Sequence, residues 1–347
     1  MDRRLLAPFW RAGLIAGLLA TSAPAARASV GEGGFAPVIS QVQPKIVKIY
    51  GAGGLRGLES YQSGFLISAE GHVLTAASTV LDSDVVTVVL DSGRRLEAKE
   101  VGVDPTLEIA VLKVDASDLP YFDLAEAPEA DIAVRVLAFS NLFGVATGNE
   151  PASVQHGAVS VVTKLDARRG AAATRYRGPI LVLDAMTNNP GAAGGALTDV
   201  QGRLLGMLGK EVRSSLTNTW LNYALPASEL RPAVERILAG QSAPPPQANL
   251  AREDALELSA LGLVLMPEVL DRTPPYVDAV RPGSPAAKAG LLPDDLIVFA
   301  EGELTPSVRA VQAVLARVDR GQRLRLTVSR GQDLIEVTLE PPAPQDL

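Results

Sequence analysis

Short apolar runs at close spacing constrain the fold of this chain more than any other feature. Between residues 46 and 225 they follow one another at short intervals, separated by turns that contain glycine, proline or aspartate. Runs of this length, many of them rich in valine, favour β-strands over helices. Strands are expected at residues 46–49, 64–68, 72–75, 85–90, 110–114, 135–138, 158–163, 180–184 and 204–208. So many short strands predict a mostly β domain, either a barrel or a sandwich.

The pattern changes after residue 226, where the first domain is expected to end. Residues 230–238 have apolar spacing typical of a helix, and Ser228 is placed to cap it. Residues 240–247 include three consecutive prolines, which cannot continue a helix and extend the chain as a linker. Further strands are expected at residues 263–266, 276–280, 296–300, 323–329 and 335–339, with a helix at 307–318. A chain of 347 residues is long enough for two such domains.

The N-terminus has the pattern of a secretory signal peptide. Arginines precede the apolar residues 13–20, and Ala26-Arg27-Ala28 has the small residues of a cleavage site. Cleavage after Ala28 is favoured over an uncleaved anchor, because the apolar run is short for a bilayer. No later segment is long and apolar enough to span a membrane. The protein is therefore expected to be secreted, in the periplasm.

Charge and composition exclude several functions. Residues 1–28 carry four arginines and one aspartate, so their removal changes the formal charge from −7 to −10. Such an acidic chain repels phosphates, and nucleic acid is not an expected partner. The absence of cysteine excludes disulfides and thiol catalysis, and two histidines make a multi-histidine metal site improbable. No metal and no cofactor are expected.

Four segments share a motif order with one known family. They are Ser63-Gly64-Phe65-Leu66-Ile67-Ser68 with its continuation to Ala77, Asp104-Pro105-Thr106-Leu107-Glu108-Ile109-Ala110-Val111-Leu112-Lys113-Val114, Ala138-Phe139-Ser140-Asn141-Leu142-Phe143-Gly144, and Thr187-Asn188-Asn189-Pro190-Gly191-Ala192-Ala193-Gly194-Gly195-Ala196-Leu197. In this order they resemble the HtrA/DegP family of trypsin-like serine proteases. The resemblance covers about residues 40–240 and implies a trypsin-like double β-barrel.

The resemblance continues beyond the linker. Residues 261–263, 280–291 and 295–297 look like a PDZ domain, a small β-rich α+β fold that follows the protease domain in this family. The expected organisation is a signal peptide at 1–28, a leader at 29–43, a trypsin-like domain at 44–239, a linker at 240–258, a PDZ domain at 259–341 and a tail at 342–347.

The positions that carry the catalytic triad in the family hold other residues here. Ala193 stands at the nucleophile's place, Ser78 at the histidine's and Glu108 at the aspartate's. Alanine has no hydroxyl, and a serine cannot act as a base near neutral pH. The two histidines, His72 and His156, match no catalytic position of the family and are expected to be ordinary strand or surface residues. The sequence thus leads us to expect an inactive homologue of serine endopeptidases, with no catalytic residue.

The loop Gly191, Ala192 and Ala193 corresponds to the family's oxyanion loop. Its backbone N–H groups could still hold a peptide carbonyl, although glycines that merely keep the barrel folded are the favoured interpretation. A Ser–Lys dyad would be another way to hydrolyse peptides. Lys164 and Lys210 are the nearer lysines, but nothing in their spacing singles out either one.

The PDZ-like segment is expected to bind polypeptides. Such domains take up an extended peptide as an added strand, and the resemblance places the groove at Leu261, Gly262, Leu263, Val264 and Leu265. Protein C-termini are therefore expected partners. The same domain could instead hold oligomers together.

Three hypotheses follow. The leading one is a secreted pseudoprotease that binds polypeptides through its PDZ domain as a scaffold, regulator or chaperone-like factor in envelope protein quality control. The second is an active serine-type endopeptidase with a rebuilt site. The third is a non-catalytic subunit in mixed oligomers with an active homologue. A homo-oligomer is a further expected state of the chain.

Overall fold

The computed structural model describes residues 34–51, 60–83, 85–189, 191–241, 254–268, 273–331 and 333–340. The expected signal peptide with its cleavage site, much of the linker and the tail lie outside these ranges. The helices are α1 Ala36–Val42, α2 Ala227–Leu238, α3 Leu258–Leu261, α4 Pro285–Lys288 and α5 Val308–Leu315, with 3-10 turns η1 Gln43–Lys45, η2 Thr79–Leu81, η3 Leu124–Glu126 and η4 Leu142–Gly144. The strands are β1 Ile46–Tyr50, β2 Tyr61–Leu66, β3 His72–Ala76, β4 Val86–Val89, β5 Arg95–Asp104, β6 Ile109–Val114, β7 Arg135–Ser140, β8 Ser153–Lys164, β9 Ala167–Arg169, β10 Ala172–Ala173, β11 Pro179–Leu183, β12 Ala196–Asp199, β13 Leu204–Leu208, β14 Arg213–Ser214, β15 Tyr223–Pro226, β16 Leu263–Leu265, β17 Val277–Val280, β18 Leu296–Ala300, β19 Glu303–Leu304, β20 Leu324–Arg330 and β21 Asp333–Leu339.

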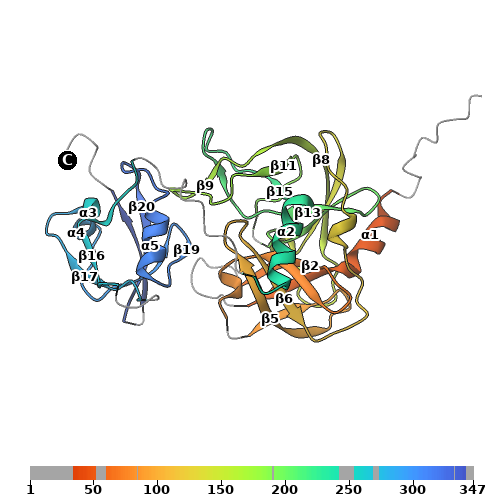
Figure 1. The fold of residues 1–347 in the computed structure, drawn as a ribbon, viewed down its shortest axis with the longest axis horizontal. Helices are drawn as coiled ribbons and strands as arrows, with labels where there is room; N and C mark the ends of the chain where they lie inside the picture. Colours follow the sequence, from red (N-terminus) through yellow and green to blue (C-terminus); the bar gives the residue numbers. More distant parts are fainter. Residues whose placement is uncertain are drawn as a thin grey trace, which may run out of the picture.

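Two closed six-stranded barrels form the first domain, as the resemblance implied. The first barrel has the strand order β1-β2-β3-β6-β5-β4, and the second has the order β11-β15-β13-β12-β7-β8. In Figure 1 the orange and yellow first barrel lies beside the green second barrel. Closure leaves neither barrel with a free edge. The mostly β, trypsin-like double barrel expected from the sequence is confirmed.

The two barrels share one apolar core, because buried side chains of both meet between them. Phe65 and Ile109 of the first barrel pack in the same cluster as Phe139 and Met207 of the second. Helix α2 follows the second barrel but returns to pack against β5 of the first, which Figure 1 shows as a helix crossing the domain. Ile237 of α2 reaches the shared core.

The N-terminal leader contains the helix α1, which the sequence pattern did not predict. Its last residue, Val42, is fully buried in the core of the double barrel. Phe35 stacks on the ring of His156, with centroids 4.8 Å apart. This segment therefore packs against the first domain.

The PDZ domain has its own core around helix α5. A two-stranded sheet, β16-β17, and a four-stranded sheet, β19-β18-β20-β21, enclose buried residues of the helix such as Val311 and Leu315. Ser307 caps α5 by accepting a hydrogen bond from the Ala310 amide at 3.2 Å. The expected helix is present, although its α-helical part ends at Leu315.

The β9–β10 hairpin of the first domain contacts the PDZ domain. Ala172 is buried in the PDZ core cluster, and the Ala171 amide donates to a carboxylate oxygen of Glu301 at 2.9 Å. Arg317 donates to the Ala173 carbonyl at 2.6 Å and to Glu303 at 2.6 Å. Figure 1 shows β9 reaching toward the blue PDZ domain. These contacts bring the PDZ domain to one rim of the cleft described next.

Within the described ranges, none of the helices is both long and apolar enough to cross a membrane.

Candidate functional site

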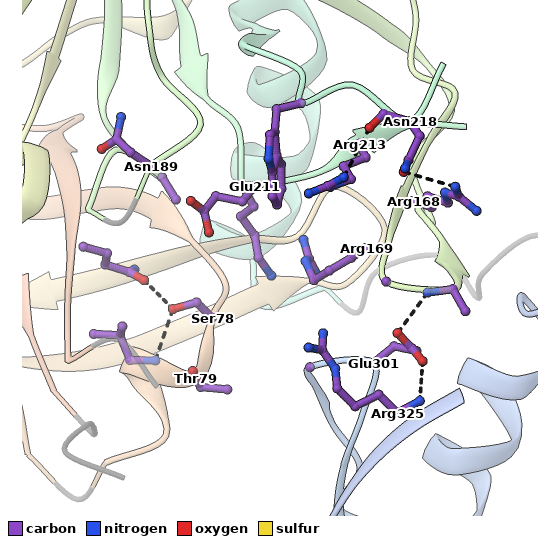
Figure 2. Close-up of a pocket in the computed structure, with 18 of the residues that line it drawn as sticks. Ser78, Thr79, Arg168, Arg169, Asn189, Glu211, Arg213, Asn218, Glu301 and Arg325 are labelled. Atoms are coloured by element: carbon purple, nitrogen blue, oxygen red, sulfur yellow. Dashed lines mark hydrogen bonds between the residues drawn. The ribbon is translucent and has the colours of Figure 1, made fainter. Parts of the chain in front are cut away.

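A cleft of about 820 Å³ lies where the two barrels and the PDZ domain meet. Figure 2 shows its wall of protease-domain residues opposite Glu301 and Arg325 of the PDZ domain. It is lined by Tyr61, Gln62, Ser78, Thr79, Val80, Arg168, Arg169, Gly170, Ala171, Asn189, Gly191, Ala193, Lys210, Glu211, Arg213, Asn218, Trp220, Glu301, Gly302, Gln322, Arg323 and Arg325. A second cavity of about 360 Å³ adjoins Ser78, Glu108 and Lys210. Ser78 borders both cavities, so Ser78, Glu108 and Ala193 lie around one location.

The loop around Ala193 is a glycine-rich turn at the rim of the cleft. Gly191 and Gly194 have φ angles of 85° and 83°, which favour glycine. Ala192 points inward and is fully buried, while Ala193 lines the cleft. Gly191 and Ala193 both line the cleft. Backbone N–H groups beside a cleft can stabilise the negative charge that develops on a carbonyl oxygen.

The Ser78 side chain is held at the end of strand β3. Its hydroxyl accepts a hydrogen bond from the Val80 amide at 3.1 Å and donates one to the side-chain oxygen of Gln62. Gln62 is itself fixed, because its amide nitrogen donates to Thr75 at 2.7 Å and to Ala76 at 2.8 Å. Figure 2 shows the hydroxyl between its two partners at the edge of the cleft.

Glu108 forms a compact ionic cluster with two cations. Arg169 donates to both carboxylate oxygens at 3.2 Å, and the Lys210 ammonium lies 3.3 Å from one of them. Burial alone would raise the pKa of Glu108, but the Arg169 and Lys210 charges outweigh it and hold that pKa well below its usual range. Glu108 is therefore a salt-bridged acid in the folded protein.

Lys210 is the residue that sequence reasoning could not single out. Its ammonium donates a hydrogen bond of 2.8 Å to the carbonyl of Ala77, the residue that precedes Ser78. Burial, and then the neighbouring Arg169 charge, lower the pKa of Lys210 despite the opposing effect of Glu108. Lys210 is separated from Glu108 by 102 positions, so only the barrel topology reveals that they meet.

The two histidines lie outside the cleft. His72 shares a hydrogen bond of 2.8 Å with Ser68 on the first barrel. His156 stacks on Phe35 and accepts a hydrogen bond from Arg135 at 3.2 Å. In the described part of the chain, no group of three or more acidic or histidine side chains is arranged to hold a metal ion.

The expected PDZ groove residues lie together on α3 and β16. Gly262 ends α3 with a φ of 70°, and its carbonyl accepts from the Arg281 amide at 2.9 Å. Leu263 and Leu265 are buried, whereas Val264 is 52% exposed. A cavity of about 400 Å³ lies between α5 and the segment from Ala255 to Ser259, which includes the start of α3.

Comparison with known proteins defines the class. Residues 62–207 match the family described as a trypsin-like peptidase domain, and residues 276–330 match the PDZ domain. The chain is therefore a trypsin-like peptidase domain followed by a PDZ domain. Its relatives include proteins named DegP-like, in line with the resemblance seen in the sequence.

Two curated relatives illustrate the similarity. The "Putative serine protease HhoB" of Synechocystis sp. is 29% identical over 291 residues, covering 82% of this chain and 67% of that protein. The "Probable periplasmic serine endoprotease DegP-like" of Halomonas elongata is 28% identical over 289 residues, covering 81% of this chain and 56% of that protein. The chain thus spans between about half and two thirds of these relatives. The solved structure "HtrA-type protease AlgW with tripeptide" is 26% identical, with a TM-score of 0.49, covering 90% of this chain and 99% of that one.

These relatives contradict the expectation that the chain is not an enzyme. Both are named as serine proteases and match about four fifths of the chain. The expectation depended on Ser78, Glu108 and Ala193 alone. Their side chains remove the usual catalytic mechanism, but a hydroxyl, an amine and backbone amide groups remain together in the cleft. The replacement of the serine, histidine and aspartate of the usual triad does not by itself exclude every other mechanism of peptide hydrolysis.

Proposed function

We propose that this chain is a serine-type endopeptidase that cleaves polypeptides with a rebuilt active site. The observation that carries the proposal is that Ser78, Lys210, Gly191 and Ala193 border one cleft. The names of the relatives support the reaction class. Endopeptidase activity in envelope protein quality control is the function that this arrangement supports best.

The proposed mechanism uses Ser78 as nucleophile and Lys210 as base. A neutral Lys210 amine takes the Ser78 hydroxyl proton while the oxygen attacks the peptide carbonyl carbon. The amides of Gly191 and Ala193 stabilise the resulting oxyanion. Lys210 then gives its proton to the leaving amine nitrogen as the C–N bond breaks, and water hydrolyses the ester. The lowered pKa of Lys210 increases its neutral fraction, so activity is expected to rise toward alkaline pH.

Cleavage of casein by the purified protein tests this proposal. Ser78→Ala and Lys210→Met are each expected to abolish cleavage, whereas Ser117→Ala, which removes an exposed hydroxyl bonded only to its neighbour Asp118, leaves it unchanged. Equal cleavage by Ser78→Ala and the unmodified protein would rule out Ser78 as the nucleophile. No cleavage by any form from pH 6 to 10 would rule out the endopeptidase itself.

A second proposed function is capture of polypeptide C-termini by the PDZ domain. The exposed Val264 on β16 and the cavity between α5 and the start of α3 support it, because a peptide added to such a strand needs both an edge and a pocket. Peptides with a free C-terminus are expected to bind in calorimetric titration, and C-terminally amidated ones are not. Gln312→Trp, which fills the cavity, should weaken binding, whereas Thr338→Trp on exposed β21 should not. Equal binding of amidated peptides would refute carboxylate recognition.

We further infer a periplasmic location after cleavage behind Ala28. The apolar N-terminus and the periplasmic names of the DegP-like relatives support this location. Mass spectrometry of the secreted protein should find Ser29 at the mature N-terminus, and an intact Met1 would contradict it. Assembly into homo-oligomers, or with an active homologue, also stays a prediction, which native mass spectrometry can test.

A further inference from the structure

The cleft is cationic although the chain is acidic. Six basic side chains line it, namely Arg168, Arg169, Lys210, Arg213, Arg323 and Arg325, against the two acidic side chains of Glu211 and Glu301. The whole chain has a formal net charge of −7. A concave surface lined by one sign of charge concentrates ligands of the opposite sign. The positive charge of the cleft in an otherwise acidic chain therefore points to an anionic ligand.

Some of these cations are already neutralised inside the protein. Arg169 and Lys210 share Glu108, and Arg323 pairs with Glu340 at 2.9 Å at the outer rim. In contrast, Arg168, Arg213 and Arg325 form no ion pair with a carboxylate of the described residues.

The unpaired arginines of the protease domain are nevertheless held in place by neutral groups. Arg168 donates to the Asn218 side chain at 3.1 Å. The Arg213 guanidinium lies 4.3 Å from the centroid of the Trp220 ring, and it also donates to the Asn218 carbonyl at 3.4 Å. Stacking on an aromatic ring orients a guanidinium without neutralising it. Figure 2 places these arginines on one wall of the cleft and Arg325 on the opposite wall.

Two buried acceptors in the same cleft lack donors. Asn189 is only 6% exposed, and its side-chain oxygen has no partner among the described residues. The side-chain oxygen of Gln322 on the PDZ side is likewise unpaired. Buried polar atoms without partners are costly, but each of these oxygens is too enclosed for a ligand atom to reach. Recognition of a ligand is therefore carried by the arginines.

We propose that the cleft selects acidic segments of polypeptides. Aspartate and glutamate side chains of the ligand would pair with Arg168 and Arg213 on one wall and with Arg325 on the other. Acidic polypeptides are thus the substrate class that we propose for the endopeptidase. Their cleavage depends on the endopeptidase activity proposed above, but their binding does not.

Fluorescence anisotropy of labelled peptides on the full chain tests the proposal. The probe is a twelve-residue peptide rich in aspartate and glutamate, with an amidated C-terminus that excludes carboxylate capture by the PDZ groove. The protein carries Ser78→Ala, so binding is measured without cleavage. The acidic peptide should bind at least about tenfold more tightly than its Asn/Gln counterpart at low salt, and the difference should shrink as salt rises.

Arginine variants locate the site. The double variant Arg213→Gln/Arg325→Gln is expected to lose about tenfold in affinity for the acidic peptide, while Arg231→Gln on the remote helix α2 should lose none. Equal affinity for the two peptides, or an unchanged affinity of the double variant, would overturn the proposal. Displacement of the peptide by polyphosphate at equal charge concentration would show a general anion site and also overturn it. Because binding is independent of Ser78, failure here leaves the casein result to decide the endopeptidase separately.

Discussion

Glu108→Gln is expected to destabilise the double barrel substantially. Gln has nearly the same shape as Glu, so the change removes charge and leaves the packing. The carboxylate makes three contacts of 3.2 to 3.3 Å with Arg169 and Lys210. After the change, two cations face each other in a partly buried site with no anion between them.

The magnitude follows from burial and charge. Removing one partner of a buried ion pair costs about 3–5 kcal/mol in the free energy of unfolding. The side chains of Glu108, Arg169 and Lys210 are each about one-fifth exposed, so the lower end applies, about 3 kcal/mol. This corresponds to roughly a hundredfold decrease in the ratio of folded to unfolded protein.

The pH dependence of the loss has a definite sign. The pKa of Glu108 is lower in the folded protein than its ordinary value of 4.5. Above pH 4.5 the carboxylate therefore stabilises the fold, and this contribution is lost as the pH falls toward the folded-state pKa. The difference between Glu108→Gln and the unmodified protein should be greatest near pH 7 and narrow below pH 4.5.

Urea unfolding monitored by circular dichroism measures this difference. Glu235→Gln, which removes the acid of the exposed Arg231–Glu235 pair on α2, is the matched control and should leave the midpoint unchanged. If Glu108→Gln shifts the midpoint no more than this control, or if its effect is the same at pH 4 and pH 7, the account of the ionic cluster is refuted.

Two further perturbations probe the loop and the domain contact. Gly194→Ala is expected to lower the free energy of unfolding by about 2 kcal/mol or more, because its φ is +83° and a Cβ would clash with the Ser63 carbonyl. Gly283→Ala, at φ +74° with open space around it, should lower it by only about 1 kcal/mol. Equal melting temperatures of the two variants would contradict this. Arg317→Ala removes the 2.6 Å hydrogen bond to the Ala173 carbonyl and should accelerate amide hydrogen exchange in the β9–β10 hairpin; unchanged exchange would show that this bond does not hold the hairpin on the PDZ domain.

Regular strands with alternating or continuous apolar residues were predictable. β13 and β18 have the predicted bounds, because their runs are apolar and buried. β5 was missed, since seven of its residues from Arg95 to Val101 read as a charged surface segment. It forms because both of its edges pair, with β4 and with β6. Pairing with neighbours outweighed local composition there.

Motif order singled out Ser78, Glu108 and Ala193 as positions of interest, but the contacts around them could not be predicted from the sequence. The cluster joins Glu108 to Lys210 across 102 positions and to Arg169 across 61. Such contacts depend on how the two barrels pack, and no periodicity in the sequence encodes them. The contribution of the PDZ domain to the cleft was hidden for the same reason.

The most direct test of the proposed rebuilt site is covalent labelling with a fluorophosphonate probe, which reacts with activated serine hydroxyls. Mass spectrometry of the digested protein is expected to find the probe on Ser78, with labelling abolished in Lys210→Met and unaffected in Ser117→Ala. Complete absence of labelling at Ser78 from pH 6 to 10, while an active serine protease in the same mixture is labelled, would contradict the account.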